Sequence, residues 1–336
     1  MSSTTMKVPT PVKWVFDRFP VVQYQTTPQS KAIAYSDTVN RCFEFRDVKS
    51  SMHNPEYDGG NSKNDNSGND NFQLGVYSVN GFEIGGTDVM LARDPLCLYA
   101  QLSLCKKNNL RLPTKFEEGN NEKKNQPKLD AESTLDSHFT TDVVGIRKPG
   151  NKVVILSEKA HKDERLPILI ETTMNGQSKN IKRYVRSMDS IMIILDSKLE
   201  SAELAIGNLL DTTVYDAFLL CTIHNNLVYE TYGCSPDTLH TLSKRNRFFT
   251  RHPQISSLSL GQIYTPSPSD LEKQLAMAKD ILLLLQSTYD KFSDYLRLKV
   301  ASYVLALLHL PSFGEFLRAE CSKLLDDSTT IVKDFL

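Results

Sequence analysis

The chain has 336 residues, 40% of them hydrophobic, and its 39 Lys and Arg residues nearly balance its 40 Asp and Glu residues. This length fits two packed domains better than one, and the hydrophobic content is enough for a sizeable core. A formal net charge of −1 excludes a global attraction to nucleic acid or anionic lipid, so a charged partner must be met by a local patch.

The residues that usually bind metals or perform catalysis are scattered along the chain. There is no Gly-rich phosphate loop, no nucleophile elbow and no pair of histidines at metal-ligand spacing. The six cysteines form no closely spaced pair, which argues against a zinc site or a dithiol redox centre and fits a reducing compartment; they are Cys42, Cys97, Cys105, Cys221, Cys234 and Cys321. We therefore expect no metal and no cofactor.

The first twenty residues do not resemble a targeting segment. They contain no apolar core of a secretory signal, and Pro9, Pro11 and Pro20 together with the acidic Asp17 argue against an import presequence. No run of about 18 consecutive apolar residues occurs anywhere in the chain. We expect a soluble or peripheral protein.

Two polar stretches interrupt the first half of the chain. Residues 59–71 are nearly all Gly, Asn, Asp and Ser, and residues 117–137 are charged and polar. Such segments bury too little apolar surface to offset the entropy lost on ordering, so both are predicted to be disordered inserts in a smaller scaffold.

Strand and helix signals alternate between these inserts. Residues 73–79 predict a strand that ends at the turn-prone pair Asn80-Gly81. Residues 94–108 predict a helix, with Asp94 as N-cap and Pro95 at the first helical position. Residues 110–114 predict a further short strand.

Three more strands and a helix follow the second insert. The strands are predicted at 152–157, 166–171 and 182–187, and the helix at 187–197 with Ser187 as N-cap. This order of strands and helices predicts an α/β domain over residues 73–197, preceded by an N-terminal segment, 1–72.

The remainder, residues 198–336, is predicted to be an all-α domain. Apolar residues recur there at three- or four-residue spacing over 206–221, 271–285, 300–308 and 313–324, with Pro311 ending the third helix. The stretch 231–268 is rich in Ser, Thr and Pro and is predicted to be a long irregular connection.

A basic and aromatic segment at 243–252 is the strongest candidate contact surface. It is predicted to bind a partner through both charge and apolar contact; its candidate residues are Lys244, Arg245, Arg247, Phe248, Phe249 and Arg251. The alternative is a solvated basic loop whose phenylalanines pack on the helical domain. Nucleic acid is disfavoured, since no basic stripe continues elsewhere in the chain.

The second candidate surface lies near the N-terminus. Lys13, Trp14, Phe16 and Arg18 make an aromatic and basic segment that suits a headgroup boundary or a protein partner. The same residues would equally pack along their own domain. Cys97 in the first turn of the 94–108 helix has two interpretations, a reactive thiol or a packed core cysteine.

Three features are similar to the glutathione-transferase fold. They are the order of the elements, a proline before the second group of strands, and the all-α domain that follows. In that resemblance Pro167 takes the place of the family's cis-proline, and Ser187 that of the serine in its Glu-Ser pair. Arg186 replaces the glutamate, which implies loss of the anchor for the glutathione amino group. Tyr77 and Ser78 stand nearest to the position of a thiol activator.

More specifically, the chain resembles the metaxin family, and within it the small metaxin-2-like peripheral subunits of the fungal mitochondrial sorting and assembly machinery. The blocks that carry this resemblance are VPTPVKWVFDRFP, LGVYSV, DPLCLYAQLSLCKKNNLRLPT, LPILIE, LLDTTVYDAFL, LSKRNRFFTRH and LRLKVASYVLAL. It implies a thioredoxin-like α/β domain with a helical C-terminal domain, at the cytosolic face of the mitochondrial outer membrane.

The resemblance also implies a function and partners. The chain would be a non-catalytic subunit beside a membrane-embedded assembly barrel and a second metaxin-like subunit, and would help recognise the β-signal of β-barrel precursors. A glutathione-dependent transferase or peroxidase using Tyr77, Ser78 or Cys97 is the alternative. A soluble cytosolic adaptor without membrane association is a third hypothesis.

Overall fold

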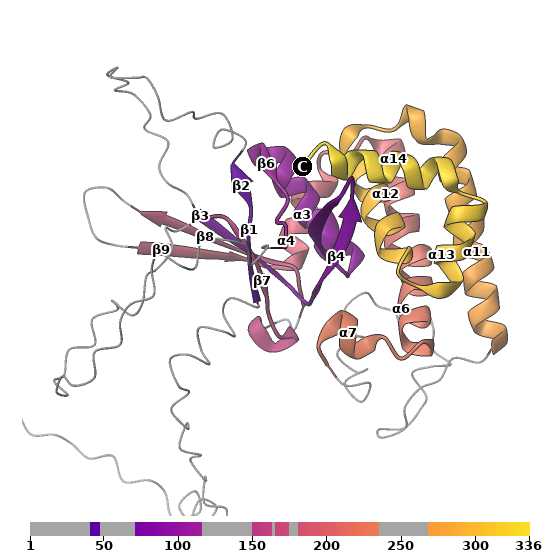
Figure 1. The fold of residues 1–336 in the computed structure, drawn as a ribbon, viewed down its shortest axis with the longest axis horizontal. Helices are drawn as coiled ribbons and strands as arrows, with labels where there is room; N and C mark the ends of the chain where they lie inside the picture. Colours follow the sequence, from indigo (N-terminus) through magenta and orange to yellow (C-terminus); the bar gives the residue numbers. More distant parts are fainter. Residues whose placement is uncertain (1–40, 48–70, 116–149, 163–164, 175–180, 235–267) are drawn as a thin grey trace, which may run out of the picture. The chain divides into compact units, whose positions relative to one another are not determined.

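The computed structural model describes residues 41–47, 71–115, 150–162, 165–174, 181–234 and 268–336. All of them belong to one compact unit, Arg41–Leu336. A mixed β-sheet and its helices come first in this unit, and a set of helices follows (Figure 1). This confirms the sequence prediction of a mixed α/β region followed by an all-α region, while both predicted inserts lie almost wholly outside the described residues.

The main sheet has five strands in the order β1-β7-β3-β8-β9. Their bounds are Cys42–Glu44 (β1), Lys152–Ile155 (β7), Asn71–Val76 (β3), Ile168–Met174 (β8) and Ile181–Arg186 (β9). β3 and β7 are parallel, and the other three neighbouring pairs are antiparallel. The strands predicted near 73, 152, 166 and 182 are thereby confirmed, and β1 adds a strand that the sequence did not indicate.

The centre of the sheet is packed too tightly for any side chain at Gly75. A Cβ atom there would lie 2.5 Å from Leu156 Cδ1 and 2.9 Å from Ile168 Cγ1. The neighbouring Leu74 is completely buried and lies opposite Val153 of β7 in the register. The glycine therefore allows β3 to lie between two bulky neighbours.

A β-hairpin follows β3 at a position where the sequence predicts a turn. β4 (Val79–Ile84) runs through Asn80 and Gly81, and it pairs with β5 (Thr87–Ala92). The chain reverses instead at Gly85 and Gly86, whose φ angles of 58° and 78° lie in the left-handed region. The prediction of a turn at 80–81 is therefore wrong. Both Asn-Gly and Gly-Gly suit a left-handed two-residue turn, and the pairing of β4 with β5 places the turn at the two glycines.

The helix after this hairpin begins and ends near the predicted positions. α3 spans Pro95–Asn108, and the side chain of its N-cap Asp94 accepts hydrogen bonds from the backbone N–H groups of Leu96 and Cys97. Asn109 ends the helix in the left-handed conformation. The strand predicted at 110–114 is only the two-residue β6 (Leu110–Arg111), which pairs with β2 (Arg46–Asp47).

Between β7 and β8 the described residues include a short 3₁₀-helix, η2 (Glu158–Ala160). The Leu166–Pro167 peptide bond before β8 is cis, as the resemblance implied. After β9, the helix α4 (Met188–Asp196) begins at Ser187, whose Oγ accepts from the backbone N–H of Ser190. The predicted helix and its N-cap are confirmed.

The helical region opens with a continuous helical stretch over residues 201–224. It consists of α5 (Ser201–Leu209), a π-helical turn η3 (Leu210–Val214) and α6 (Tyr215–His224). Among the described residues this is the one helix long and apolar enough to cross a membrane, but 56% of its most apolar window is buried inside the protein. Length and composition of this kind are also typical of a core helix in a globular protein.

The other helices of this region within the described residues are α7, α11, α12, α13 and α14, with the short η5 before α12. Their bounds are Val228–Tyr232 (α7), Pro268–Thr288 (α11), Tyr289–Lys291 (η5), Asp294–Leu307 (α12), Pro311–Ala319 (α13) and Ser322–Lys333 (α14). The apolar face predicted over 313–324 belongs to two helices rather than one. Pro311 is the first residue of α13, where a backbone N–H would have no partner within the helix, so its absence in proline costs no hydrogen bond. The preceding helix, α12, ends earlier, at Leu307.

α12 is the central helix of the described structure. Nearly every residue from Leu296 to Leu307 is buried. It packs against α14 on one side and α3 on another (Figure 1), so it joins the helical region to the helix that covers the sheet.

Asp94 provides a test of how the two regions are joined. Its side chain is 1% exposed; Oδ1 caps α3, while Oδ2 accepts hydrogen bonds from the hydroxyls of Tyr215 (2.9 Å) and Tyr232 (3.1 Å). We expect Asp94→Ala to lower the free energy of unfolding by about 2–4 kcal/mol, because it removes a cap and leaves two buried hydroxyls without this acceptor. Urea denaturation measures this loss.

The matched control for Asp94 is Asp280→Ala, which removes an exposed carboxylate from α11. It should change the free energy of unfolding by less than about 0.5 kcal/mol. Equal effects of the two substitutions would contradict the role assigned to Asp94.

Candidate functional site: a buried polar junction

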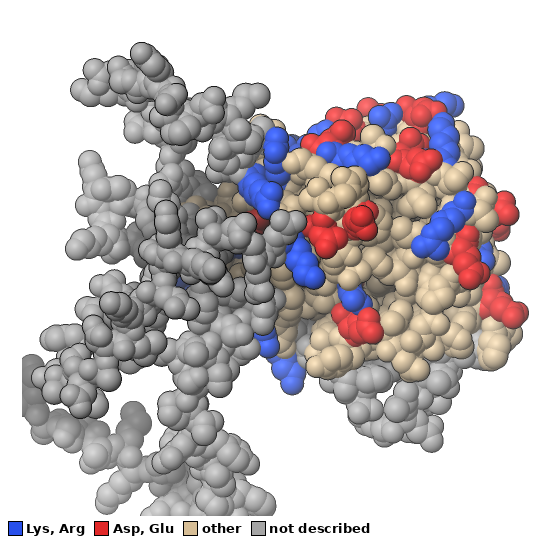
Figure 2. All heavy atoms as spheres, viewed as in Figure 1, with Lys and Arg blue, Asp and Glu red and all other residues tan. Residues whose placement is uncertain are grey.

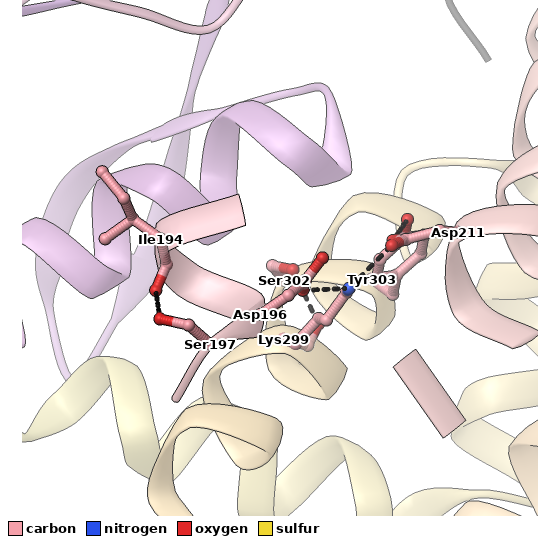
Figure 3. Close-up of polar contacts among 7 residues, drawn as sticks. All are labelled: Ile194, Asp196, Ser197, Asp211, Lys299, Ser302 and Tyr303. Carbon is pink, nitrogen blue, oxygen red and sulfur yellow. Dashed lines mark hydrogen bonds and ion pairs between the residues drawn. The ribbon is translucent and has the colours of Figure 1, made fainter. Parts of the chain in front are cut away.

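Three polar side chains, those of Asp196, Asp211 and Tyr303, lie near the ammonium group of Lys299 and come from three segments (Figure 3). Lys299 Nζ lies 3.1 Å from Asp196 Oδ1 at the end of α4 and 2.7 Å from Asp211 Oδ2 in η3. The hydroxyl of Tyr303 donates to Asp211 Oδ1 at 2.7 Å. Only 1% of the Lys299 side chain is exposed, so both carboxylates act on a cation that is shielded from water.

The local sequence explains how this cluster forms. Lys299 and Tyr303 are four residues apart on α12 and therefore lie on one face of the helix. Gly207 of α5 leaves room for the ammonium, since a Cβ there would lie 3.3 Å from Nζ. The ring of Tyr99 on α3 lies 5.6 Å from the same nitrogen, which adds a cation–π contact.

The π-helical turn η3 carries the carboxylate that the cluster shares. A π-turn shifts the helix register by one residue and is often found where a helix side chain has a special role. Burial raises the pKa of Asp211, while Lys299 and the hydrogen bond from Tyr303 act to lower it. Burial also raises the pKa of the Tyr303 hydroxyl, which therefore remains a hydrogen-bond donor. The cluster is a paired and hydrogen-bonded charge centre, which makes it a structural junction.

A second polar contact joins the start of the helical region to α12. The Glu203 carboxylate accepts from the backbone N–H of Ser293 at 2.6 Å, from Ser293 Oγ at 2.7 Å and from the backbone N–H of Glu200 at 3.1 Å. Burial acts to raise the pKa of Glu203, but the hydrogen bonds from Ser293 and Glu200 outweigh it and hold the pKa below its usual range. One carboxylate therefore serves the N-termini of both α5 and α12.

The residues considered for glutathione chemistry are occupied by structural contacts. Tyr77 is buried and its hydroxyl accepts from the backbone N–H of Leu166 at 2.6 Å, and Ser78 Oγ donates to the Thr231 carbonyl at 2.8 Å. Cys97 is completely buried, as the packed-core interpretation expects. These three side chains are therefore not arranged as an accessible nucleophile and its activator.

Arg186 and Ser187 are likewise engaged. Arg186 Nε lies 2.8 Å from Glu171 Oε2 on the neighbouring strand, and Ser187 caps α4. A guanidinium in this position repels an ammonium group instead of binding it. Within the residues that the structure describes, no group of three or more His, Cys, Asp or Glu side chains could hold a metal ion.

The candidate contact residues from the sequence lie outside the described residues. This applies to all ten of them: Lys13, Trp14, Phe16, Arg18, Lys244, Arg245, Arg247, Phe248, Phe249 and Arg251. On the visible face of the described part, basic and acidic side chains are interspersed, without an extended area of one sign (Figure 2). That distribution agrees with the balanced composition of the chain.

The junction around Lys299 is a feature that the sequence analysis missed. A signal was present, because Lys299 interrupts the apolar stretch LRLKVASYVLAL at a position that faces the core. A lysine in such a run requires a buried anion nearby. The identity of that anion could not be read from the sequence, since Asp196 lies 103 residues and Asp211 lies 88 residues before Lys299.

Two comparisons with known proteins bear on this structure. Residues 6–171 match the model of a family described as "SAM35, subunit of SAM complex". The chain is also 29% identical, over 371 aligned positions covering 99% of both chains, to the "Sorting assembly machinery 35 kDa subunit" of Saccharomyces cerevisiae. By these two matches the chain is similar to the SAM35 family. The resemblance to fungal metaxin-like subunits of that machinery is thereby confirmed.

Replacement of the buried lysine tests whether the junction stabilises the fold. We expect Lys299→Met to lower the free energy of unfolding by about 3–5 kcal/mol, because Asp196 and Asp211 lose the cation that compensates their partial burial. Combining Lys299→Met with Asp211→Asn should cost less than the sum of the two single changes. Urea denaturation of the four proteins gives the coupling energy.

The matched control is Lys323→Met, which breaks the exposed ion pair with Asp290. It should cost at most about 1 kcal/mol, because solvent screens that pair. If the effects of Lys299→Met and Asp211→Asn on the free energy of unfolding were additive, the stabilising contact between these two residues would be contradicted.

Glu203 gives a pH-dependent test. Because its pKa is lowered in the folded protein, its ionised form stabilises the fold above the unfolded pKa, near 4.5, and this stabilisation is lost as the pH falls through the lower folded value. The stability difference between the parent protein and Glu203→Gln should therefore be largest at neutral pH and shrink below pH 4.5. Glu315→Gln, at an exposed site on α13, should show no such trend in the same urea titrations at several pH values.

Proposed function

We propose that this chain is a non-catalytic subunit of the mitochondrial outer-membrane sorting and assembly machinery. In this role it helps recognise the β-signal of β-barrel precursors and promotes their insertion and folding. The observation that carries the proposal is the similarity to the 35 kDa sorting assembly machinery subunit along 99% of both chains. A match of this extent covers both the sheet and the helical region, so it concerns the whole architecture.

A glutathione-transferase-like fold is part of the proposal. Four strands of the main sheet have the order β7-β3-β8-β9, with β7 parallel to β3 and the other two pairs antiparallel. A βαβ unit followed by a β-hairpin and a helix, as in β3-α3-β7 and β8-β9-α4, is the arrangement of a thioredoxin-like domain. This supports a boundary between the two domains near residues 197–198. The strand β1 pairs with β7, so the α/β domain also includes residues before the predicted boundary at 73.

The absence of an ordered reaction centre in the described part supports a binding role over the glutathione alternative. The polar side chains that the fold buries, such as Asp94, Glu203 and Lys299, are hydrogen-bonded across helix junctions. Tyr77, Ser78 and Ser187 make contacts of the same kind. These groups stabilise the fold and leave partner recognition to the surface.

The proposed location is the cytosolic face of the mitochondrial outer membrane, with peripheral attachment through protein partners. The candidate spanning stretch, Ser201–His224, supports peripheral attachment because it contributes Leu210, Val214 and Phe218 to the core. Removing these side chains from the core in order to cross a membrane would expose apolar surface throughout the helical region. The proposed partners are the membrane-embedded barrel subunit, a second metaxin-like subunit and β-barrel precursors.

Depletion of the chain from its own cells tests the proposed function directly. Radiolabelled β-barrel precursor is imported into isolated mitochondria, and its assembled form is measured by native electrophoresis. We expect loss of assembled barrel with unchanged import of matrix proteins. Normal barrel assembly in the depleted mitochondria would overturn the proposal.

The basic and aromatic segment at 243–252 is the proposed partner-binding surface. We expect alanine at Lys244, Arg245, Arg247 and Arg251 to weaken co-isolation with the barrel subunit by about tenfold or more, since charged pairs in an interface contribute several kcal/mol together. The measurement is quantitative recovery of the barrel subunit with the tagged chain.

The control for that variant carries the same change in net charge on exposed helix surfaces. Alanine at Lys273, Arg318, Lys323 and Lys333 removes four exposed cations from α11, α13 and α14. It should leave recovery of the barrel subunit unchanged. An equal loss with both variants would indicate a nonspecific effect of net charge and would exclude this role for 243–252.

A further inference from the structure

The strand β9 lies at the edge of the main sheet. It pairs with β8 from Leu169↔Arg186 to Met174↔Ile181, and it has no strand on its other side among the described residues. Figure 1 shows it as the last strand beyond β8. In an antiparallel pair every second residue of such a strand directs its N–H and C=O groups away from the partner strand. β9 therefore presents a row of backbone donors and acceptors over its six residues.

The side chains of β9 are unusually open to solvent for a strand. Arg183, Tyr184, Val185 and Arg186 are all exposed, and the large apolar residues Tyr184 and Val185 are 53% and 52% exposed. Consecutive residues of a strand point to opposite faces of the sheet. An apolar side chain is therefore available on both faces of this edge, where most edge strands bury one face and carry charge on the other.

The chemistry of the edge determines the kind of partner that fits it. Only an extended chain places its own N–H and C=O groups at the spacing of a strand edge, whereas a helix satisfies these groups internally. The apolar side chains on both faces favour a strand that carries apolar residues of its own. The opposite edge of the sheet, β1, is only three residues long and offers half the length for pairing.

Charge further restricts the partner. Arg186 is paired with Glu171 on β8, but no ion pair joins Arg183 to another residue in the described ranges. Among the side chains of β9 that the structure describes, Arg183 is therefore a cation without an ion pair inside the described sheet. A strand with an acidic residue opposite Arg183 would be favoured over a neutral or basic one.

We infer that the outer edge of β9 binds an extended amphipathic strand of an unfolded β-barrel precursor as a sixth strand of the sheet. This inference rests on the proposed function, because that function supplies the class of partner. It assigns precursor contact to the α/β region, separate from the segment at 243–252 that is proposed to contact the barrel subunit.

A binding measurement with backbone-methylated peptides tests the inference on the unmodified full-length chain. The probe is a fluorescent synthetic peptide with the sequence of the last strand of a mitochondrial β-barrel protein, followed by fluorescence anisotropy. Two further peptides carry N-methyl groups at odd or at even positions, so that each has one blocked hydrogen-bonding edge. Strand addition predicts that one methylated peptide binds at least tenfold more weakly, while the other binds like the parent.

Substitutions in the chain locate the site. Tyr184→Ser combined with Val185→Ser should weaken peptide binding at least fivefold, and Arg183→Glu should weaken binding of a peptide that carries an acidic residue. The matched controls are Tyr229→Ser on α7, where the tyrosine is 71% exposed, and Arg318→Glu on α13. Neither control should alter peptide binding.

The outcomes separate this inference from the proposed function. Absence of peptide binding, equal effects of the two methylated peptides, or unchanged binding by the β9 variants would each overturn the inference. In parallel, recovery of the barrel subunit with the tagged β9 variants should remain at the parent level. Failure of the unmodified chain to co-isolate with the barrel subunit would overturn the proposed function, whatever the peptides show.

Discussion

A cation shielded from water at the centre of the helical region constrains much of the described structure. The ammonium of Lys299 requires compensation by nearby anions, since an unpaired charge in the core costs several kcal/mol. Asp196 at the end of α4 and Asp211 in the π-turn η3 provide it, at 3.1 and 2.7 Å. These residues come from different parts of the chain. Pairing the charge of this one lysine therefore fixes the end of α4, the register of η3 and the position of α12 together.

Two other buried carboxylates have the same use. Asp94 caps α3 and also accepts from two tyrosines of the helical region, and Glu203 serves the starts of α5 and α12. Each joins segments that are far apart in the sequence. These buried polar groups hold helices to one another. In the proposed subunit role, partners are recognised by the molecular surface, where the exposed strand β9 is the edge inferred to bind precursor.

Much of the fold could be predicted where the signals are local. Asp94 and Ser187 were identified as N-caps because a short polar side chain before an apolar helical run is sufficient evidence, and Pro95 strengthened the first case. The turn at 80–81 was predicted wrongly because Asn-Gly and Gly85-Gly86 compete as turn signals and only strand pairing decides between them. The division of 313–324 into two helices was missed because apolar spacing continues through the break between Ala319 and Ser322.

By itself the sequence determined the order of strands and helices, the main helix starts and the resemblance to metaxin-like subunits, because these depend on neighbouring residues or on recognisable blocks. Only the tertiary structure decided that β1 joins the sheet, that Asp196 and Asp211 compensate Lys299, and that β9 is left as an open edge. The physical reason is the same in each case. Strand partners and buried ion pairs join residues separated by many positions, and a charged or apolar residue in the sequence carries no information about which distant group it will meet.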